Sequence, residues 1–223
     1  MKFYPVKTPK IVQNIFRSYI WNIPTKKKEI YLTFDDGPIP EITPWVLKTL
    51  SDYNAKATFF CIGENVKNHP NIFQNIIDQG HTIGNHTYHH LNGWKTSTQK
   101  YVNSIDKAES IQYSTGSRYN YSKQFESKLF RPPYGKIKPG QAKKITEIGY
   151  KIIMWDVLSG DFDQKLIKED CYQNVIKNSK NGSIIVFHDS EKAFKNLEYT
   201  LPKVLEYCTV NGFIFKALNN IAP

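Results

Sequence analysis

The sequence predicts an α/β fold, a distorted (β/α) barrel of about seven parallel strands. Strand-like and helix-like segments alternate along the chain, the connections between them are short, and some strands are uninterrupted apolar runs such as SIIVF and KIIMW. Alternation of this kind favours a parallel sheet. Parallel strands covered by helices on both faces lose the polar alternation of a half-exposed strand. A doubly wound open sheet is the alternative with the same pattern.

The predicted elements follow one another in a regular order. Seven strands are predicted at 29–34, 56–62, 81–84, 128–131, 150–156, 183–187 and 212–216. Six helices are predicted at 43–53, 70–79, 97–112, 141–148, 166–179 and 198–209. The second helix has Pro70 in its first turn and Gly80 after its end, which are common start and stop signals. The polar stretch 113–127, rich in tyrosine and serine, is expected to be a surface loop.

Composition sets limits on the class of protein. The 223 residues suit one domain, and the apolar fraction of 40% is enough for a core. A net charge of +10 indicates either acidic partners, such as an anionic wall polymer, or simply a solvated lysine-rich surface. We expect no nucleic-acid binding, because no helix-turn-helix, zinc finger or aromatic RNA platform is present. The three cysteines lack metal-ligand spacing, which argues against a cysteine-bound metal and a disulfide framework.

The first 28 residues are expected to form an N-terminal extension, and residues 29–223 the barrel. Between Lys10 and Trp21, apolar residues recur at helical spacing, which predicts a short amphipathic helix. This helix either closes the bottom of the fold, which we favour, or makes peripheral contact with a membrane surface. No run approaches the ~20 apolar residues of a transmembrane segment. No signal peptide is seen, so we expect a location in the cytoplasm or at the inner membrane.

Polar residues that carry chemistry follow the predicted strands. In a parallel barrel the carboxyl ends of the strands share one face, and enzymes of this architecture keep their active sites there. We therefore expect these side chains to converge on one site. They are Asp35 and Asp36 after the first strand, His86 and His90 after the third, Arg131 at the end of the fourth, Asp156 and Asp161 after the fifth, and His188 after the sixth.

A divalent metal would explain why Asp35 and Asp36 are adjacent, because a cation at Asp36 would offset the repulsion between two carboxylates. One aspartate with His86 and His90 would form a three-residue site with open positions, as in catalytic zinc sites. Zinc is the first choice, and cobalt, nickel, manganese or iron would fit the same ligands. The HTYHH stretch alone is a modest signal, because histidine-rich turns are often surface features and His89 lies between the two ligands.

The remaining residues suggest hydrolysis. Asp35 is suited to accept a proton from a metal-held water, and its alternative role is that of a turn or capping residue. His188 is suited to protonate a leaving amine, although a buried core histidine is the commoner case. Either Asp161 or Asp156 would orient His188. Arg131 would orient Asp35 or act only as a structural clamp, and the backbone amides of Tyr134 and Gly135 could donate to an oxyanion.

Five motifs in order resemble those of the polysaccharide deacetylase family, carbohydrate esterase family 4, also called the nodulation-B homology domain. The resemblance covers nearly the whole chain after Lys28. Five ordered motifs at compatible spacing are specific, whereas any one alone is weak. They are TFDDGP at 33–38, HTYHH at 86–90, RPPYG at 131–135, WDVLSGDF at 155–162 and the apolar run that ends in His188.

The resemblance implies a barrel of seven to eight strands and removal of acetyl groups from N-acetylated sugars in peptidoglycan or chitin oligomers, or from O-acetylated xylan. It implies release of acetate by a metal-dependent hydrolase. The implied roles are Asp35 as base; Asp36, His86 and His90 as metal ligands; His188 as acid; the Tyr134 amide in oxyanion binding; and Arg131 and Asp161 as partners that tune Asp35 and His188.

One motif departs from the family. The family usually has Asp-Trp where this chain has Asp161-Phe162, a difference that bears on substrate preference more than on catalysis. We expect Phe162 and Pro132 to line the substrate pocket. The expected substrate is an N-acetylglucosamine-containing glycan. The alternatives are a metal-containing glycan-binding module with no turnover, and a deacylase for a non-polysaccharide amide or an O-acetyl ester.

Overall fold

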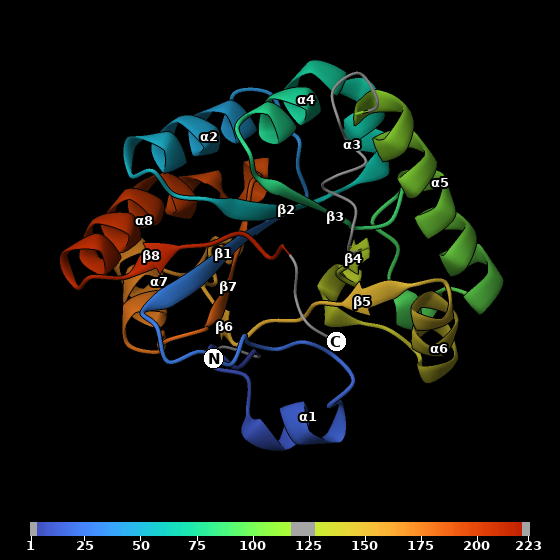
Figure 1. Cartoon of the computed structure of the whole chain (residues 1–223), viewed down its shortest axis with the longest axis horizontal. Coiled ribbons are helices and arrows are strands. Elements are labelled where there is room, and N and C mark those ends of the chain that lie inside the picture. The colour runs from blue at the N-terminus through green and yellow to red at the C-terminus, as the bar shows by residue number, and fades with distance from the viewer. Residues whose placement is uncertain (1–3, 117–127, 220–223) are drawn as a thin grey trace.

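The computed structural model describes residues 4–116 and 128–219. Within them, eight strands form one parallel sheet in the order β5-β4-β3-β2-β1-β7-β6, with β8 beside β1. The sheet curls into an incomplete barrel, which confirms the predicted fold class (Figure 1). The strands are β1 (Glu29–Asp35), β2 (Ala57–Cys61), β3 (Thr82–Asn85), β4 (Lys128–Phe130), β5 (Tyr150–Ile152), β6 (Val157–Leu158), β7 (Ile184–His188) and β8 (Ile214–Phe215).

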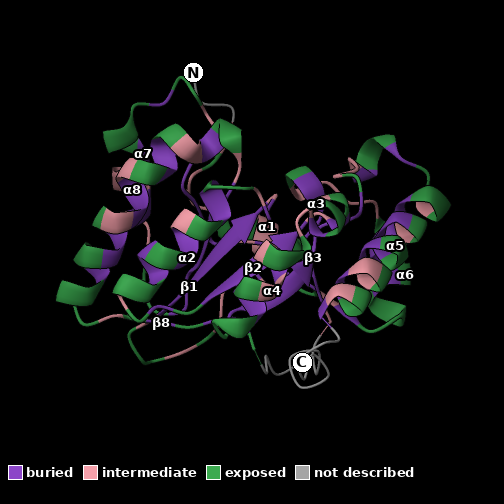
Figure 2. Ribbon diagram, turned by 90° about the horizontal axis from the view of Figure 1, so that it is seen from above, coloured by how far each residue is buried: buried purple, intermediate pink, exposed green. Residues whose placement is uncertain are grey.

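Helices surround the curled sheet and cover its outer face (Figure 1). Their inward sides and the strands are buried, while their outward sides are exposed (Figure 2). They are α1 (Lys10–Ile15), α2 (Ile42–Asp52), α3 (Gly63–Asn68), α4 (Pro70–Asp78), α5 (Thr98–Gly116), α6 (Pro139–Glu147), α7 (Lys168–Ile176) and α8 (Glu191–Val210), with 3-10 turns η1 (Gly93–Lys95) and η3 (Pro133–Gly135). No helix of the described residues is long and apolar enough to cross a membrane.

The register of the central strands separates the core from the site. Phe34 of β1 is paired with Phe59 of β2 and Phe187 of β7, and its ring stacks on theirs at 5.1 and 5.9 Å between centroids. Burying each such side chain contributes roughly 1.5–3 kcal/mol. Because successive residues of a strand point to opposite faces, Asp35 points away from this apolar layer. Its register partner on β7 is His188.

The N-terminal segment lies between the two ends of the sheet, where β5 and β6 do not pair with each other. Ile20 donates its amide N–H to Ile152 O at 2.9 Å, next to Ile153, with which it forms a parallel bridge. On the other side, the amide of Leu158 donates to Val6 O at 2.8 Å. The chain before β1 therefore fills the gap in the barrel through backbone hydrogen bonds.

The helix predicted between Lys10 and Trp21 is shorter than expected. It spans α1 alone, none of its residues is buried, and Ile11 and Ile15 are exposed. Trp21, after the helix, packs in an apolar cluster that includes Phe130. Val12 of α1 is half-buried and packs against the same cluster, so the fold is closed by this residue together with the segments that flank the helix.

Other element predictions need correction. The predicted strand 150–156 is too long: β5 ends at Ile152, and the chain then crosses from one end of the sheet to the other, where Val157 and Leu158 pair with β7 as β6. The short helix α3 was not predicted, and α8 begins seven residues before its predicted start at position 198, at Glu191. Residues 113–116 of the predicted loop are helical, as part of α5, and 117–127 lie outside the described residues.

Candidate functional site

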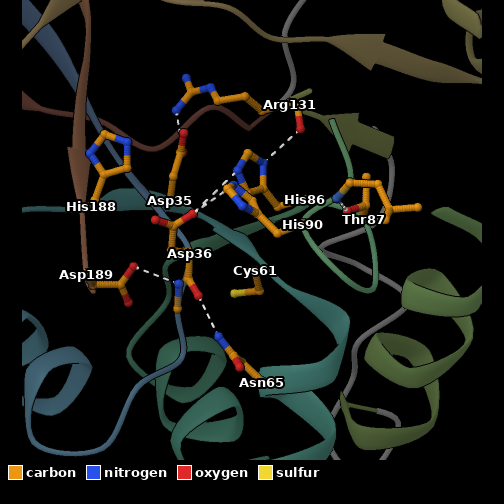
Figure 3. A network of polar contacts seen from close by, with 12 residues as sticks. Asp35, Asp36, Cys61, Asn65, His86, Thr87, His90, Arg131, His188 and Asp189 are labelled. Carbon is orange, nitrogen blue, oxygen red and sulfur yellow. Dashed lines mark hydrogen bonds and ion pairs between the residues drawn. The ribbon is translucent and has the colours of Figure 1, made fainter. Parts of the chain in front are cut away.

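Most of the predicted site residues converge at the carboxyl ends of the strands (Figure 3). Asp35 ends β1 and His188 ends β7, and the two are register partners. The picture places His188 on one side of Asp35 and Asp36, and the pair His86 and His90 on the other. The other members come from the loops after β3, β4 and β6. The site thus draws on five strands, as the barrel topology predicts.

Asp36, His86 and His90 form a cluster suited to a metal ion. One ligand atom from each lies within 4.8 Å of the others. Oδ1 of Asp36 is 3.2 Å from Nε2 of His90 and 3.7 Å from Nε2 of His86. This oxygen is buried and has no hydrogen-bond partner among the described residues. A buried carboxylate oxygen without a partner is unfavourable, and a cation between the three groups would satisfy it. His89 points elsewhere, with Nδ1 3.3 Å from Glu64.

The two imidazoles are prepared as neutral ligands. Nδ1 of His86 lies 2.8 Å from Arg131 O, and since a carbonyl only accepts, Nδ1–H donates there and leaves the Nε2 lone pair toward Asp36. Burial, followed by the nearby His90, lowers the pKa of His86 well below its ordinary value, despite Asp36. Burial also lowers the pKa of His90. Neutral imidazole is the form that binds metals.

The turn that carries Asp36 is fixed from two sides. Asp36 has a φ of 85°, a conformation that is strained for a non-glycine residue. Asn65 of α3 donates from Nδ2 to Asp36 O at 2.7 Å, and Gly37 N–H donates to Oδ1 of Asp189 at 3.1 Å. Thr43 Oγ1 donates to Oδ2 of the same buried carboxylate at 2.6 Å. A Cβ at Gly37 would clash with that Oδ2, so only glycine fits.

Asn65 and Asp189 are the functional residues that sequence reasoning missed. Asp189 directly follows His188, and this acidic neighbour of a site residue was an available signal. Asn65 offered none, because it lies on a helix that was not predicted and acts on a backbone carbonyl.

Asp35 is held by a fully buried arginine. Nη1 of Arg131 donates to Oδ1 of Asp35 at 2.7 Å and to Oγ1 of Thr33 at 2.7 Å. Its other nitrogens donate to the carbonyls of Met154 and Ile153 at 2.9 and 3.2 Å. With its donors engaged on several sides, the guanidinium is fixed and its charge directed at Asp35. Removing one partner of such a pair strongly destabilises the folded protein, because the other partner is then a buried charge without a counter-charge.

His188 is held by Asp161 and not by Asp156. Nδ1 of His188 is 2.8 Å from Oδ1 of Asp161, and its amide N–H donates to Oδ2 at 2.7 Å. Burial opposes protonation of His188, but Asp161 outweighs it and raises the pKa of His188 to about 9. Asp156 instead accepts from Lys7 Nζ at 2.6 Å and from Ser183 Oγ at 2.7 Å. The sequence did not decide which of the two carboxylates contacts His188, and in the structure it is Asp161.

Aromatic side chains flank the cluster. The ring of Phe162 stands edge-on to His188 with 5.2 Å between centroids, and the ring of Tyr134 lies 4.5 Å from that of His90. Tyr134 is 60% exposed and has a φ of 59°. Pro132 is buried, and its carbonyl accepts from the amide of Gly135 at 2.9 Å. Phe162 thus lies beside His188, and Tyr134 lies beside His90.

Known proteins resemble this chain in sequence. Residues 22–153, 132 of the 223, match the family described as polysaccharide deacetylase. A peptidoglycan-N-acetylglucosamine deacetylase of Bacillus cereus is 40% identical over 173 residues, which are 78% of this chain and 60% of that protein. The chain therefore spans less than two thirds of that relative. A chitooligosaccharide deacetylase of Azorhizobium caulinodans is 33% identical over 168 residues, 75% of this chain and 76% of that protein.

A solved structure resembles the whole fold. The crystal structure of the Bc1960 peptidoglycan N-acetylglucosamine deacetylase superposes with a TM-score of 0.84 at 36% identity and covers 96% of each chain. The family match extends over more than half of the chain. The motifs follow one another in the sequence in the family's order, and the fold brings them to one site. The chain belongs to the polysaccharide deacetylase family, carbohydrate esterase family 4.

Proposed function

We propose that this protein is a metal-dependent N-deacetylase that removes acetyl groups from an N-acetylglucosamine-containing glycan, peptidoglycan or chitooligosaccharide, and releases acetate. One observation carries the proposal: Oδ1 of Asp36, which has no hydrogen-bond partner among the described residues, faces the imidazoles of His86 and His90 beside the register partners Asp35 and His188. The printed functions of the relatives from B. cereus and A. caulinodans support the reaction and the substrate class.

Asp36, His86 and His90 would hold the metal. The two nitrogens and one oxygen suit zinc first, and cobalt, nickel, manganese or iron as well. A metal bound there would supply a Lewis acid for the acetyl carbonyl.

Asp35 would act as the base. As the attacking water forms its bond to the acetyl carbon, Asp35 accepts a proton from it. Arg131 keeps Asp35 oriented through the 2.7 Å contact to Oδ1. The backbone amide of Tyr134 would donate to the oxyanion, and Phe162 and Pro132 would line the pocket for the acetyl group.

His188 would act as the acid. Its Nδ1–H is engaged by Asp161, so the proton at Nε2 is the one available for transfer. The raised pKa of His188 keeps it charged at neutral pH. As the C–N bond breaks, His188 protonates the departing sugar amine and acetate is the other product.

Acetate release tests the proposal. The purified protein is incubated with N-acetylglucosamine oligomers, peptidoglycan, acetylated xylan and small acetamides, and its bound metals are measured by elemental analysis. Acetate from the N-acetylated glycans, with about one metal per chain, supports the proposal. Glycan binding without acetate would favour a binding module, and acetate from only the xylan or the small amides would favour the other deacylase.

A further inference from the structure

Trp94 is an exposed aromatic residue on the same edge of the barrel as the site. It lies in η1, which follows β3 and the loop of His86 and His90, and 61% of its surface is exposed. A single exposed apolar side chain is common and needs no explanation. Trp94 differs from an ordinary exposed side chain in the hydrogen bonds that hold its turn and in the residues that contact its indole.

The turn that presents Trp94 is held rigidly. Asn92 Oδ1 accepts the amide of Trp94 at 3.1 Å, and Asn92 O accepts the hydroxyl of Thr96 at 2.7 Å. Gln141, which is fully buried, donates from Nε2 to Gly93 O at 2.9 Å and to Thr96 O at 3.1 Å. A buried side chain of α6 thus fixes two carbonyls of an exposed turn.

The same turn lies against the chain that follows the RPPYG motif. A Cβ at Gly93 would clash with Lys136 O, so the contact requires glycine. The indole Nε1–H of Trp94 donates to Ile137 O at 3.3 Å, and Nζ of Lys136 lies 5.3 Å from the indole centroid, over its face. The indole is therefore oriented at one edge by a hydrogen bond and has a cation over one of its faces.

This pair is continuous with the active site. Lys136 is two residues after Tyr134, and the Tyr134 ring contacts that of His90 at 4.5 Å. Trp94 is four residues after His90. The segment 134–137 therefore links the ring of Tyr134, beside His90, to the indole of Trp94, and we call this segment together with η1 the rim.

The rim is positively charged. Neither 91–100 nor 131–144 contains an aspartate or a glutamate. An anionic ligand is favoured at such a surface. The lysines of the two segments are Lys95, Lys100, Lys136, Lys138, Lys143 and Lys144, of which Lys143 lies 3.9 Å from Glu147.

We propose that Trp94 and Lys136 form a glycan subsite outside the acetyl pocket, which takes an anionic N-acetylated glycan such as a peptidoglycan strand. The face of a pyranose ring stacks on the indole, because its C–H groups meet the negative face of the aromatic system. Lys136 pairs with a carboxylate of the same polymer. Since hydrogen bonds already order the turn that carries Trp94, little conformational entropy is lost on binding. This inference rests on the proposed function for the identity of the polymer.

Substrate length tests the role of Trp94. The Trp94→Ala protein is compared with wild type on N-acetylglucosamine oligomers of two to five units. We expect kcat/KM for the pentamer to fall about tenfold, mainly through KM, as a stacking contact of this size predicts, and the fall to be smaller for the disaccharide. The control is Tyr207→Ala, a 39% exposed tyrosine in the last turn of α8, which leads into β8 beside the amino end of β1 and so lies at the end of the strands away from the site. An equal fall on both lengths, or none on the pentamer, would overturn the subsite.

Substrate charge tests the role of Lys136. Lys136→Met keeps most of the side-chain stem and should lower kcat/KM for peptidoglycan fragments more than for neutral chitin oligomers, a difference that should vanish near ~1 M salt. The control is Lys216→Met, an exposed lysine beside the amino end of β1. Equal effects on both glycans would remove the charge preference.

The proposed function and the proposed subsite can be tested separately. If wild type releases no acetate from any glycan, the proposed function is wrong. Retardation of wild type and of Trp94→Ala in gels that contain peptidoglycan still decides the subsite: loss of retardation in the variant supports it, and equal retardation overturns it.

Discussion

Asp35 and His188 are register partners on adjacent parallel strands, and each is held by a different buried group of opposite charge. Arg131 contacts Asp35 and Asp161 contacts His188. One sheet thus presents a carboxylate and a protonated imidazole side by side without letting them neutralise each other. A general base and a general acid need this separation of protonation states.

Replacement of Asp35 by asparagine should abolish most activity. The amide of the new side chain keeps an oxygen that can accept from Arg131 but cannot take a proton, so we expect kcat to fall roughly 10²–10⁴-fold. The buried guanidinium loses its counter-charge, and the free energy of unfolding should fall by about 3–5 kcal/mol. Acetate release is measured well below the unfolding temperature, with circular dichroism and metal content as controls. Undiminished kcat would exclude Asp35 as the base.

Replacement of Asp161 by asparagine should move the alkaline limit of activity. The pKa of His188 is raised to about 9, so wild-type kcat should decline as the pH rises through about 9. In Asp161→Asn this pKa should drop toward the ordinary value of about 6.5, and the decline should begin at correspondingly lower pH. The stability that the charged pair contributes is full below about pH 6.5 and is lost as the pH rises through about 9.

Asp156 supplies the matched control for that profile. Asp156→Asn removes a buried carboxylate that binds Lys7 and Ser183 but does not contact His188. Its pH–rate profile should keep the wild-type alkaline limit while its thermal stability falls. A shift in Asp156→Asn equal to that in Asp161→Asn would mean that the limit does not report His188.

The position of the site was predictable because strand direction orders residues in space. Asp35 and His188 each end an apolar run, and parallel strands bring such ends to one edge whatever their separation in the sequence. Residue type and place were enough, and no knowledge of loop conformation was needed. The packing of Phe34 between its neighbours follows from the same register.

The features that were not predictable depend on backbone contacts between distant segments. The run from Tyr150 to Leu158 has no turn signal where β5 ends, because the break is set by hydrogen bonds to Ile20 and to Ile184. The closure of the barrel by the N-terminal segment leaves no side-chain pattern either. Asp156 resembled a site residue by its place after a strand, yet its contacts are to Lys7 and Ser183.

Metal binding should stabilise the folded protein through His86 and not through His89. At a metal concentration of about 100 times Kd, the free energy of unfolding should rise by about 2.7 kcal/mol, a shift in Tm of roughly 5–10 °C. His86→Ala should abolish the shift and the bound metal. His89→Ala changes the same loop but removes contacts to Glu64 and to the ring of Tyr88, neither of which is a proposed metal ligand, so it should keep both. Thermal unfolding with and without zinc measures this, and an equal loss in both variants would contradict the ligand assignment.

Asn65 should control metal affinity without touching the metal. Its amide fixes the carbonyl of Asp36, whose φ of 85° is strained, so the Asn65→Ala turn should relax and displace the carboxylate from the two imidazoles. By analogy with groups that orient metal ligands, zinc affinity should weaken about 10–100-fold, as measured by competition with a chromogenic chelator. Asn71→Ala, at an exposed asparagine of α4, is the control and should keep wild-type affinity. Because Asn65→Ala removes a single hydrogen bond, the free energy of unfolding should fall by only about 0.5–1.5 kcal/mol. A variant with weakened stability but unchanged zinc affinity would show that the Asp36 turn holds its conformation through Gly37 and Asp189 alone.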